Sequence, residues 1–558
     1  MPDRIKHRFS GVNLPQLTVM SCMLAAFTVV LVLPLFSLFS NAFLSKTGGF
    51  VGLANYARYF DTPSLSVSVW NTIDISLVST VFSAVIGFLY AYALARTRIP
   101  FKSFFKYTAL IPIFIPTIVH ALGLVYLFGN QGILTGLGFH TELYGRFGII
   151  LSEIIFTFPQ AFLMFYVALE YADGRLYEAA DSMGVPPLAK FLRVALPEVK
   201  YTAVNVFFVC FTLAFTDFGA PKVIGGNYNV LATDIYKQVA GQFNMNMGAV
   251  VGTLLLIPAV LSFIVGRLMD SRNTGTISAK STTLTIKKSR PRDAIFFTLC
   301  AFVTLSFLTL IASLFLGALT KYYPFDLSFT LKHFAFNMST GGMGSYFNSL
   351  EMSLLTAVFG TVFVFIYAYM MEKTNGLGAL RKYGKLLSVL PLALPGMVIG
   401  LSYIFFFNSP ENPLNFIYGT VAILVLSNIL HYFSVPFFTA TGALKKLDRE
   451  YESVSESMNI PRYKTLLLVS APLSLPAILE IFMYYFVNSM VTVSAVVFLY
   501  SAHFKVASIA ISHMEEAGDI SQAAAMSILI LLINVFVRLL YELIIRLMKK
   551  RARRKEAI

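Results

Sequence analysis

Long apolar segments alternate with short polar ones along the whole chain. Most of the apolar segments approach or exceed the roughly 20 residues that a helix needs to cross a bilayer. The first is too long and too uniformly apolar for the core of a signal peptide, so we expect it to remain as a membrane helix. Twelve spans are predicted, at residues 17–43, 71–95, 107–129, 148–170, 201–218, 247–268, 294–318, 349–371, 386–408, 417–440, 473–498 and 521–547.

The second half of the sequence repeats the first. Three pairs of blocks match in the same order, which indicates a duplicated and fused unit of six spans. Because six is even, the halves are parallel repeats, related by an axis along the membrane normal, and a path between them is expected. The pairs are Asn71–Phe82 with Asn348–Phe359 at an offset of 277, Pro112 and Pro116 with Pro391 and Pro395, and Ser182–Pro186 with Ser457–Pro461.

A polar, basic stretch at residues 270–293 separates the two halves. It is rich in Ser, Thr, Lys and Arg, a composition typical of a linker. We therefore divide the chain into a first half at residues 1–269, this linker, a second half at residues 294–548 and a basic tail at residues 549–558.

Composition and charge agree with a membrane protein. Hydrophobic residues make up 57% of the chain and charged residues 13%, which excludes an ordinary soluble globule. The net charge of +15 does not indicate nucleic acid, because the basic residues cluster at the ends of apolar segments. Arg4, Lys6 and Arg8 precede the first span and Lys549–Lys555 follow the last. This positive-inside pattern predicts that both termini are cytosolic.

A polar segment of the first half, residues 176–197, predicts two short helices joined by a turn. The first helix should end at Gly184, a residue that adopts positive φ easily. Pro186 suits the turn, and a second helix at residues 189–196 should end at Pro197. A helix that protrudes from the membrane in this way can occupy a groove on another protein.

Within this segment Glu178-Ala179-Ala180, followed by Gly184 and Leu196-Pro197, resembles the EAA loop of ABC-importer permeases. The resemblance extends over nearly the whole chain. It implies the type I ABC importer permease fold and two cytosolic ATPase subunits that contact these loops. It also implies a soluble substrate-binding protein on the outer face.

The corresponding loop of the second half, residues 451–472, departs from the motif. Its acidic residue, Glu452, stands one position before the residue that aligns with Glu178, and Asn459 replaces Gly184. Asparagine is the next most tolerant residue of positive φ, so the turn should survive. The resemblance implies ATPase-coupling roles for Glu178, Ala179, Ala180, Gly184, Glu452, Glu456 and Asn459.

Two pairs of prolines mark candidate positions along the path. Pro112 and Pro116 lie four residues apart in the third span, and Pro391 and Pro395 in the ninth. Each pair should kink its helix, either to line a cavity or simply for packing. Asp217 and Phe218, which open the outer loop of the first half, are the other candidates for the path or its gate.

That outer loop, residues 217–248, should contain a turn cluster and a short helix near residues 232–239. Asp217-Phe218-Gly219, Thr233 and Ile235-Tyr236 resemble the loop of fused permeases that import ferric iron or 2-aminoethylphosphonate. The amino-acid sequence of residues 220–238 more closely resembles that of the 2-aminoethylphosphonate permeases. 2-Aminoethylphosphonate is therefore the expected substrate, with ferric iron as the alternative. A twelve-span secondary transporter is a more distant alternative.

No catalytic or metal-binding motif is present. The sequence lacks a Gly-x-x-x-x-Gly-Lys-Ser/Thr loop, so we expect ATP hydrolysis in a separate subunit and no cofactor here. The three cysteines lie in apolar segments and are interpreted as buried thiols rather than metal ligands. His120 and His431 suit helix packing better than a pore. Asp74 and its repeat counterpart Glu351 lie near the outer ends of their spans, which favours a structural or gate-rim role over proton relay.

Overall fold

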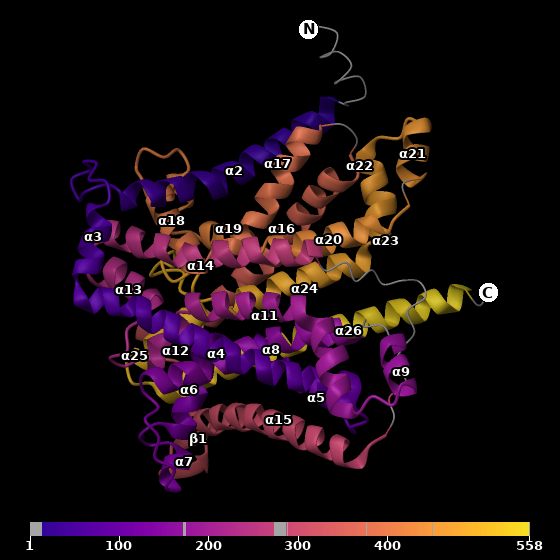
Figure 1. Ribbon diagram of the computed structural model, residues 1–558. Coiled ribbons are helices and arrows are strands. Elements are labelled where there is room, and N and C mark those ends of the chain that lie inside the picture. The colour runs from indigo at the N-terminus through magenta and orange to yellow at the C-terminus, as the bar shows by residue number, and fades with distance from the viewer. Residues whose placement is uncertain are drawn as a thin grey trace. The chain divides into compact units, whose positions relative to one another are not determined.

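The computed structural model describes residues 14–170, 174–272, 286, 288–374, 377–448 and 450–556 (Figure 1). Most of these residues are helical, as predicted. The two named strands form a small antiparallel hairpin, β1 (Thr320–Tyr322) and β2 (Asp326–Phe329), which follows directly on a membrane helix. The chain forms two compact units, and each contains most of one half together with a piece of the other.

One unit comprises Leu53–Phe336 together with Ile511–Ile528. At its centre α4 packs along α8, and a β-carbon at Gly87 would come within 2.8 Å of the Ala161 side chain. α15 packs against α4, α5 and α6. The membrane helices and short helices of this unit are α3 (Ala54–Asp61), α4 (Pro63–Arg96), α5 (Lys102–Thr108), α6 (Thr117–Phe128), α7 (Ile133–Gly136), α8 (Arg146–Glu170), α9 (Gly174–Ser182), α10 (Pro187–Lys190), α11 (Leu196–Thr216), α12 (Gly219–Ile224), α13 (Leu231–Tyr236), α14 (Met245–Arg272) and α15 (Arg290–Leu319).

The other unit contains the residues up to Gly52, Asn337–Ala510 and the chain from Leu529 onward. Here α16 packs along α24, and α2 lies along α17 and α18 (Figure 1). The helices are α2 (Leu14–Ala42), α16 (Gly344–Glu372), α17 (Gly378–Val389), α18 (Gly396–Phe407), α19 (Val421–His431), α20 (Ser434–Lys445), α21 (Glu450–Ser457), α22 (Arg462–Thr465), α23 (Ala471–Leu473) and α24 (Leu475–Val491), with α25 (Ala507–Glu516) and α26 (Ile520–Glu556) divided between the units.

Equivalent hydrogen bonds recur in the two halves and support the internal repeat. The Tyr90 hydroxyl donates to the Phe105 carbonyl at 2.8 Å, and the Tyr367 hydroxyl donates to the Gly384 carbonyl at 2.7 Å. Each tyrosine ring also meets a phenylalanine edge-on, Phe158 in the first half and Phe433 in the second. The same core construction is therefore built twice.

The spans at residues 107–129 and 386–408 were predicted to be single kinked helices, and this prediction is wrong. Each breaks into a short helix, a 3-10 turn and a second helix, with turns η1 (Ile111–Phe114) and η6 (Leu390–Ala393). In the second half the two parts are bent by 113°. The residue before each second proline is extended, for instance Ile115 at φ −128° and ψ 145°, because proline disfavours a helical residue in front of it.

Other span boundaries also differ from prediction. Pro197 does not end a helix; it lies where the π-helical turn η2 (Phe191–Ala195) continues directly into α11. The predicted span 417–440 is bent by 58° between α19 and α20. The predicted span 473–498 ends already at Val491. Among the described residues, nine helices can cross a membrane, or up to twelve if each bent pair is one span.

The basic ends of the chain are only partly described. Arg4, Lys6 and Arg8 and most of the linker 270–293 lie outside the described residues. The predicted tail 549–558 continues α26 as far as Glu556. Cys22 corrects another expectation, because it is exposed on α2, while Cys210 and Cys300 are buried.

Candidate functional site: the paired helical loops

The first loop ends its leading helix with a left-handed residue, as predicted. α9 closes at Gly184, whose φ is 68°. The Gly184 amide donates to the Asp181 carbonyl and the Val185 amide to the Ala180 carbonyl, both at 3.0 Å. This pair of hydrogen bonds is the Schellman motif, which satisfies carbonyls left free at a helix end.

The second loop is closed in the same way by a different residue. Asn459 has φ 53°, and its amide donates to the Glu456 carbonyl at 3.0 Å. The Ile460 amide donates to the Ser455 carbonyl at 2.8 Å. The prediction that asparagine preserves the turn is confirmed, and both loops have the same backbone geometry.

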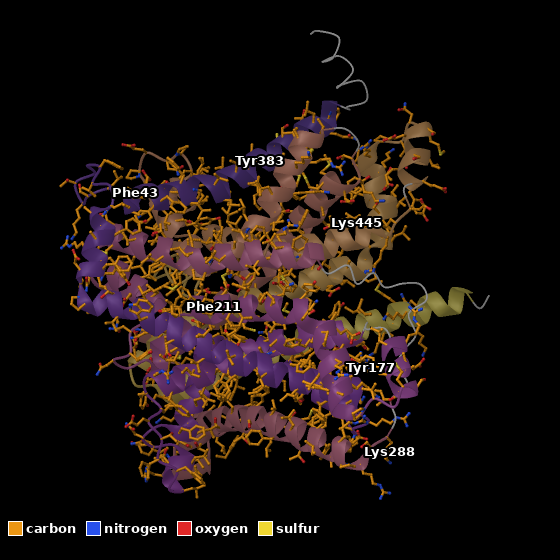
Figure 2. All side chains as sticks on the ribbon, viewed as in Figure 1. Phe43, Tyr177, Phe211, Lys288, Tyr383 and Lys445 are labelled. Carbon is orange, nitrogen blue, oxygen red and sulfur yellow. The ribbon has the colours of Figure 1, made fainter. Side chains whose placement is uncertain are left out.

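A buried arginine fixes the first loop to the membrane helices. Arg96, at the end of α4, is 6% exposed and lies 4.6 Å from the centre of the Tyr177 ring. Figure 2 shows the position of Tyr177 on α9. The Tyr177 hydroxyl donates to Glu198 of α11 at 2.8 Å, and Arg96 pairs with the same carboxylate at 3.7 Å. α9 is therefore attached to both α4 and α11 through one polar cluster.

The second loop is fixed by the residue that corresponds to Arg96. Lys373 lies 3.2 Å from the Glu452 carboxylate and donates to the Leu447 carbonyl at 3.0 Å. Both side chains are nearly enclosed, at 4% and 11% exposure. Glu452 thus faces the membrane helices, whereas Glu178 is exposed, so the displaced acidic residue has a different environment from its counterpart.

The outward faces of both loops are partly apolar. Ala180 is buried, but Glu178, Ala179 and the large apolar side chains beside them are exposed. Ion pairs between Asp181 and Lys190, and between Glu456 and Arg462, connect the two helices of each loop. The exposed apolar side chains are Leu176, Met183, Leu192 and Leu196 in the first loop and Val454, Met458, Leu467 and Leu468 in the second.

The candidate path residues of the first half meet at the break in the third span. Thr117, directly after Pro116, donates to Asp217 at 2.7 Å. The other Asp217 oxygen accepts the Ala220 amide at 2.9 Å, which caps α12. Phe218 is buried and packs on Tyr236, with ring centres 5.1 Å apart. Phe218 is thus part of the packed interior of this loop, and Asp217 is half-buried beside it.

The candidate prolines of the path lie close to the two histidines of the apolar spans, His120 and His431. The Pro112 carbonyl is 3.1 Å from Nε2 of the fully buried His120, as expected for a packing histidine. His431 makes a comparable hydrogen bond to the backbone of Leu394, next to Pro395. Pro391 is buried in the 3-10 turn η6.

Glu153 is a fully buried carboxyl in the first half. It lies on α8 with no exposed surface and interacts with the Asp217 carboxyl. Within the described chain neither Glu153 oxygen has a hydrogen-bond donor. Burial makes it unfavourable for Glu153 and Asp217 to be ionised together.

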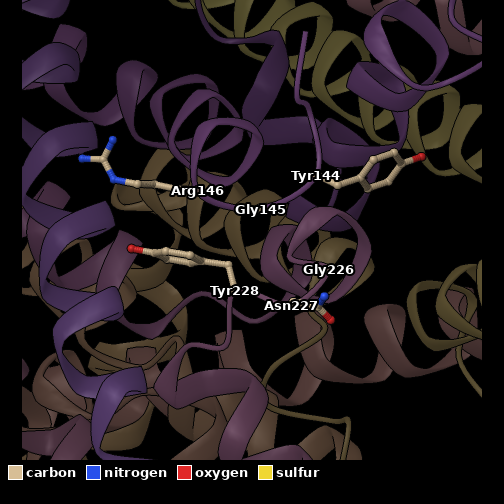
Figure 3. Close-up of a pocket in the computed structure, with 6 residues that line it drawn as sticks. All are labelled: Tyr144, Gly145, Arg146, Gly226, Asn227 and Tyr228. Carbon is tan, nitrogen blue, oxygen red and sulfur yellow. The ribbon is translucent and has the colours of Figure 1, made fainter. Parts of the chain in front are cut away.

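A pocket of about 500 Å³ opens beside Arg146, the first residue of α8 (Figure 3). Arg146 and Tyr228 point to the same side of it, and both donate to Asp74, at 2.9 Å from Arg146 Nη2 and 3.1 Å from the Tyr228 hydroxyl. Asp74 is therefore held by an ion pair, in agreement with a structural role. The second half has Val421 and Phe504 at the places of Arg146 and Tyr228, and no ion pair of Glu351 is found among the described residues.

The loops that follow the fifth spans are attached alike in both halves. Asn71 donates to the Asn229 carbonyl and Asn348 to the Lys505 carbonyl, each at 3.0 Å. The next residue in each half, Thr72 or Ser349, accepts an amide from the same loop. These bonds establish that residues 219–240 and 495–516 correspond.

The described part of the chain holds no cluster of three His, Cys, Asp or Glu side chains suited to a metal.

Comparison with known proteins gives the family. The model of the binding-protein-dependent transport system inner membrane component matches twice, at residues 83–275 and 365–550. The ferric transport system permease protein FbpB of Actinobacillus pleuropneumoniae is 29% identical over 502 residues, which cover 86% of this chain and 71% of that protein. The putative ferric transport system permease protein FbpB 1 of Haemophilus influenzae is 29% identical over 450 residues, which cover 77% of this chain and 69% of that protein.

Among solved structures, a bacterial alginate ABC transporter in complex with an alginate pentasaccharide-bound periplasmic protein has a TM-score of 0.39 and 16% identity. The match covers 48% of this chain and 95% of the chain in that structure. The two family matches fall one in each half and exclude the secondary transporter that the span count alone had left open. The chain therefore belongs to the binding-protein-dependent transport system inner membrane components, the multi-pass permeases of ABC importers, with two copies of the family domain in one polypeptide.

Proposed function

We propose that this permease imports ferric iron. The observation that carries the proposal is the extent of the similarity to ferric permeases, which spans 86% of the chain. The expectation of 2-aminoethylphosphonate rested on one loop of the first half, residues 217–248, and the comparisons do not support it. Ferric iron, the alternative in the sequence analysis, is therefore the better-supported substrate.

The paired loops are the proposed contacts for two ATPase subunits. Each presents exposed apolar side chains, such as Met183 and Met458, that a groove on a partner could cover. Each is also attached to the membrane helices, through Arg96 or Lys373. Movement of an ATPase would therefore be transmitted to α4 and α16. The chain has no nucleotide-binding loop of its own, so purified alone it should not hydrolyse ATP.

The proposed orientation follows from α8, which separates the first loop from the pocket. α8 begins at Arg146, beside the pocket, and ends at Glu170, shortly before α9. A helix of this length extends about 38 Å, enough to cross the bilayer. If the loops contact cytosolic ATPases, the pocket faces outward, toward a substrate-binding protein. Asn227→Cys should then react with an impermeant thiol reagent in intact cells and Met183→Cys should not, both in a Cys22→Ser background.

Gene deletion tests the substrate. The deletion strain should lose uptake of radioactive ferric iron and regain it with the intact gene. Growth on 2-aminoethylphosphonate as sole phosphorus source should be unchanged. Loss of that growth with normal iron uptake would overturn the ferric assignment and restore the phosphonate one.

A further inference from the structure

One ion pair joins the two copies of the family domain away from the paired loops. Lys222 lies in α12 of the first copy, and Glu516 ends α25 of the second. Their side chains are 2.6 Å apart. Glu516 belongs to the segment 511–528, which comes from the second copy but packs within the unit built from the first.

Aromatic and acidic groups surround this ion pair. The Lys222 ammonium lies 5.1 Å from the centre of the Tyr236 ring, a favourable cation–π position. Glu515 adds a second carboxyl that interacts with Lys222 and lies near Tyr144. Tyr236 itself rests on Phe218. Lys222 is thus attracted from the second copy while the aromatic residues of the first hold it in place.

The ion pair has no symmetric counterpart. The loops correspond residue by residue, so the places of Lys222 and Glu516 are taken in the opposite copies by Phe498 and Ala240. An apolar ring and a methyl group cannot form an ion pair. The contact is therefore a specific feature of one side of the duplicated molecule and is not required by the repeat.

We propose that Lys222 and Glu516 form a latch that holds segment 511–528 on the first copy and opens once in each transport cycle. In the proposed orientation the loops at residues 219–240 and 495–516 face outward. A path between the two copies can open on that side only if contacts between these loops break. Lys222 is 23% exposed and Glu516 43%, and ion pairs as accessible as this are weak enough to break and re-form. The proposal rests on the proposed function of the chain as an ATPase-driven permease.

Reversible cross-linking tests the latch. Lys222→Cys/Glu516→Cys, in a Cys22→Ser background, is treated in proteoliposomes with a bis-methanethiosulfonate linker long enough to replace the two side chains. The permease is assembled with its ATPase and binding protein. Cross-linking should lower ferric uptake and ATP hydrolysis at least tenfold, and a reductant should restore both. Failure to cross-link, or full activity of the cross-linked protein, would overturn the proposal.

A matched pair controls for the chemistry. Lys321→Cys/Asp326→Cys replaces an ion pair within the β1–β2 hairpin, where cross-linking should leave activity unchanged. ATP hydrolysis separates this proposal from the ferric assignment. If the substrate is another solute, iron uptake is absent before cross-linking, whereas the effect of the linker on hydrolysis remains.

Charge reversal gives an independent measurement. Lys222→Glu should raise ATP hydrolysis by the assembled complex in the absence of substrate several-fold, because the latch no longer holds. Lys222→Glu/Glu516→Lys restores opposite charges and should return hydrolysis to within twofold of the original protein. Equal values for the single and double variants would contradict a latch between these two residues.

Discussion

Gly184 and Asn459 have the same left-handed backbone conformation at corresponding places in the two loops, with φ of 68° and 53°. Each ends a helix whose last carbonyls are satisfied by the two amides that follow. A β-carbon at Gly184 would have no neighbour within 4 Å. A side chain there meets no steric clash, so the effect of a substitution depends on backbone conformation alone.

Gly184→Val should therefore uncouple the permease without preventing its insertion. A β-branched residue is disfavoured by about 1–2 kcal/mol in this conformation, and the loop would re-aim α9 to avoid it. We expect normal expression but loss of the ATPase on co-purification, together with loss of uptake. Gly184→Asn is the control and should retain both. A normal complex and normal uptake for Gly184→Val would show that this loop is not the coupling element.

Asn459 allows the complementary test in the second loop. Asn459→Gly should be neutral or slightly stabilising, since glycine adopts positive φ more easily than asparagine. Asn459→Val should weaken ATPase binding as Gly184→Val does. The measurement is again co-purification with uptake in cells. If only the first loop responds to valine, the two loops do not contribute equally.

These turns show where sequence reasoning succeeds. A glycine or asparagine after a short helix, followed by proline, determines the local backbone, and the prediction needed no knowledge of tertiary contacts. The internal repeat was recognisable for a similar reason, since Asn71 and Asn348 make the same hydrogen bond. Local chemistry that the duplication retained is readable in the sequence.

The errors have a common physical origin in long-range contacts. Pro116 indicates a disturbed helix, but whether the helix bends or breaks depends on tertiary contacts at that point. Here the Thr117 hydroxyl donates to Asp217, a hundred residues later in the chain. Glu452 belongs to the loop by sequence, yet Lys373 draws it inward. The membership of segment 511–528 in the unit of the first half follows from packing that no local pattern encodes.

The Lys373–Glu452 pair gives a stability prediction. Lys373→Met should destabilise the second half by about 3–5 kcal/mol, because it leaves a nearly enclosed carboxylate without its partner. Lys373→Met/Glu452→Gln removes both charges and should recover much of the loss. Thermal unfolding of the purified protein in detergent measures both variants. Equal melting temperatures for the single variant and the original protein would show that the pair has no structural role.

Glu153 should tolerate neutralisation. The second half has Asn428 at the corresponding place on α19, so an uncharged amide already occupies this position of the repeat once. Glu153→Gln supplies a donor to Asp217 without a titrating proton and should keep both stability and uptake. Asp217→Ala removes the acceptor of Thr117 and the cap of α12, and should cost about 1–3 kcal/mol. A large loss of uptake in a stable Glu153→Gln protein would instead make this proton functional.

Asp234 predicts a pH dependence of stability. It lies on α13, 3% exposed, and burial is the main cause that raises its pKa from 3.8 to about 6, against opposing contributions from Ser68 and Lys237. Because the folded protein holds this proton more tightly than the unfolded chain, the contribution is most favourable below about pH 4 and is lost as pH rises toward 6. The full change is at most about 3 kcal/mol.

Replacing Asp234 should remove this slope. Asp234→Asn keeps the shape of the side chain but cannot ionise, and Ala510 shows that the other copy needs no carboxyl at the corresponding place. The variant should be more stable than the original protein at pH 7 and equally stable near pH 4, with no change between pH 4 and 6 from this site. Thermal unfolding across that range, compared with Asp326→Asn in the exposed β1–β2 hairpin, measures the difference. Parallel curves for Asp234→Asn and the original protein would mean that Asp234 titrates normally in the folded state.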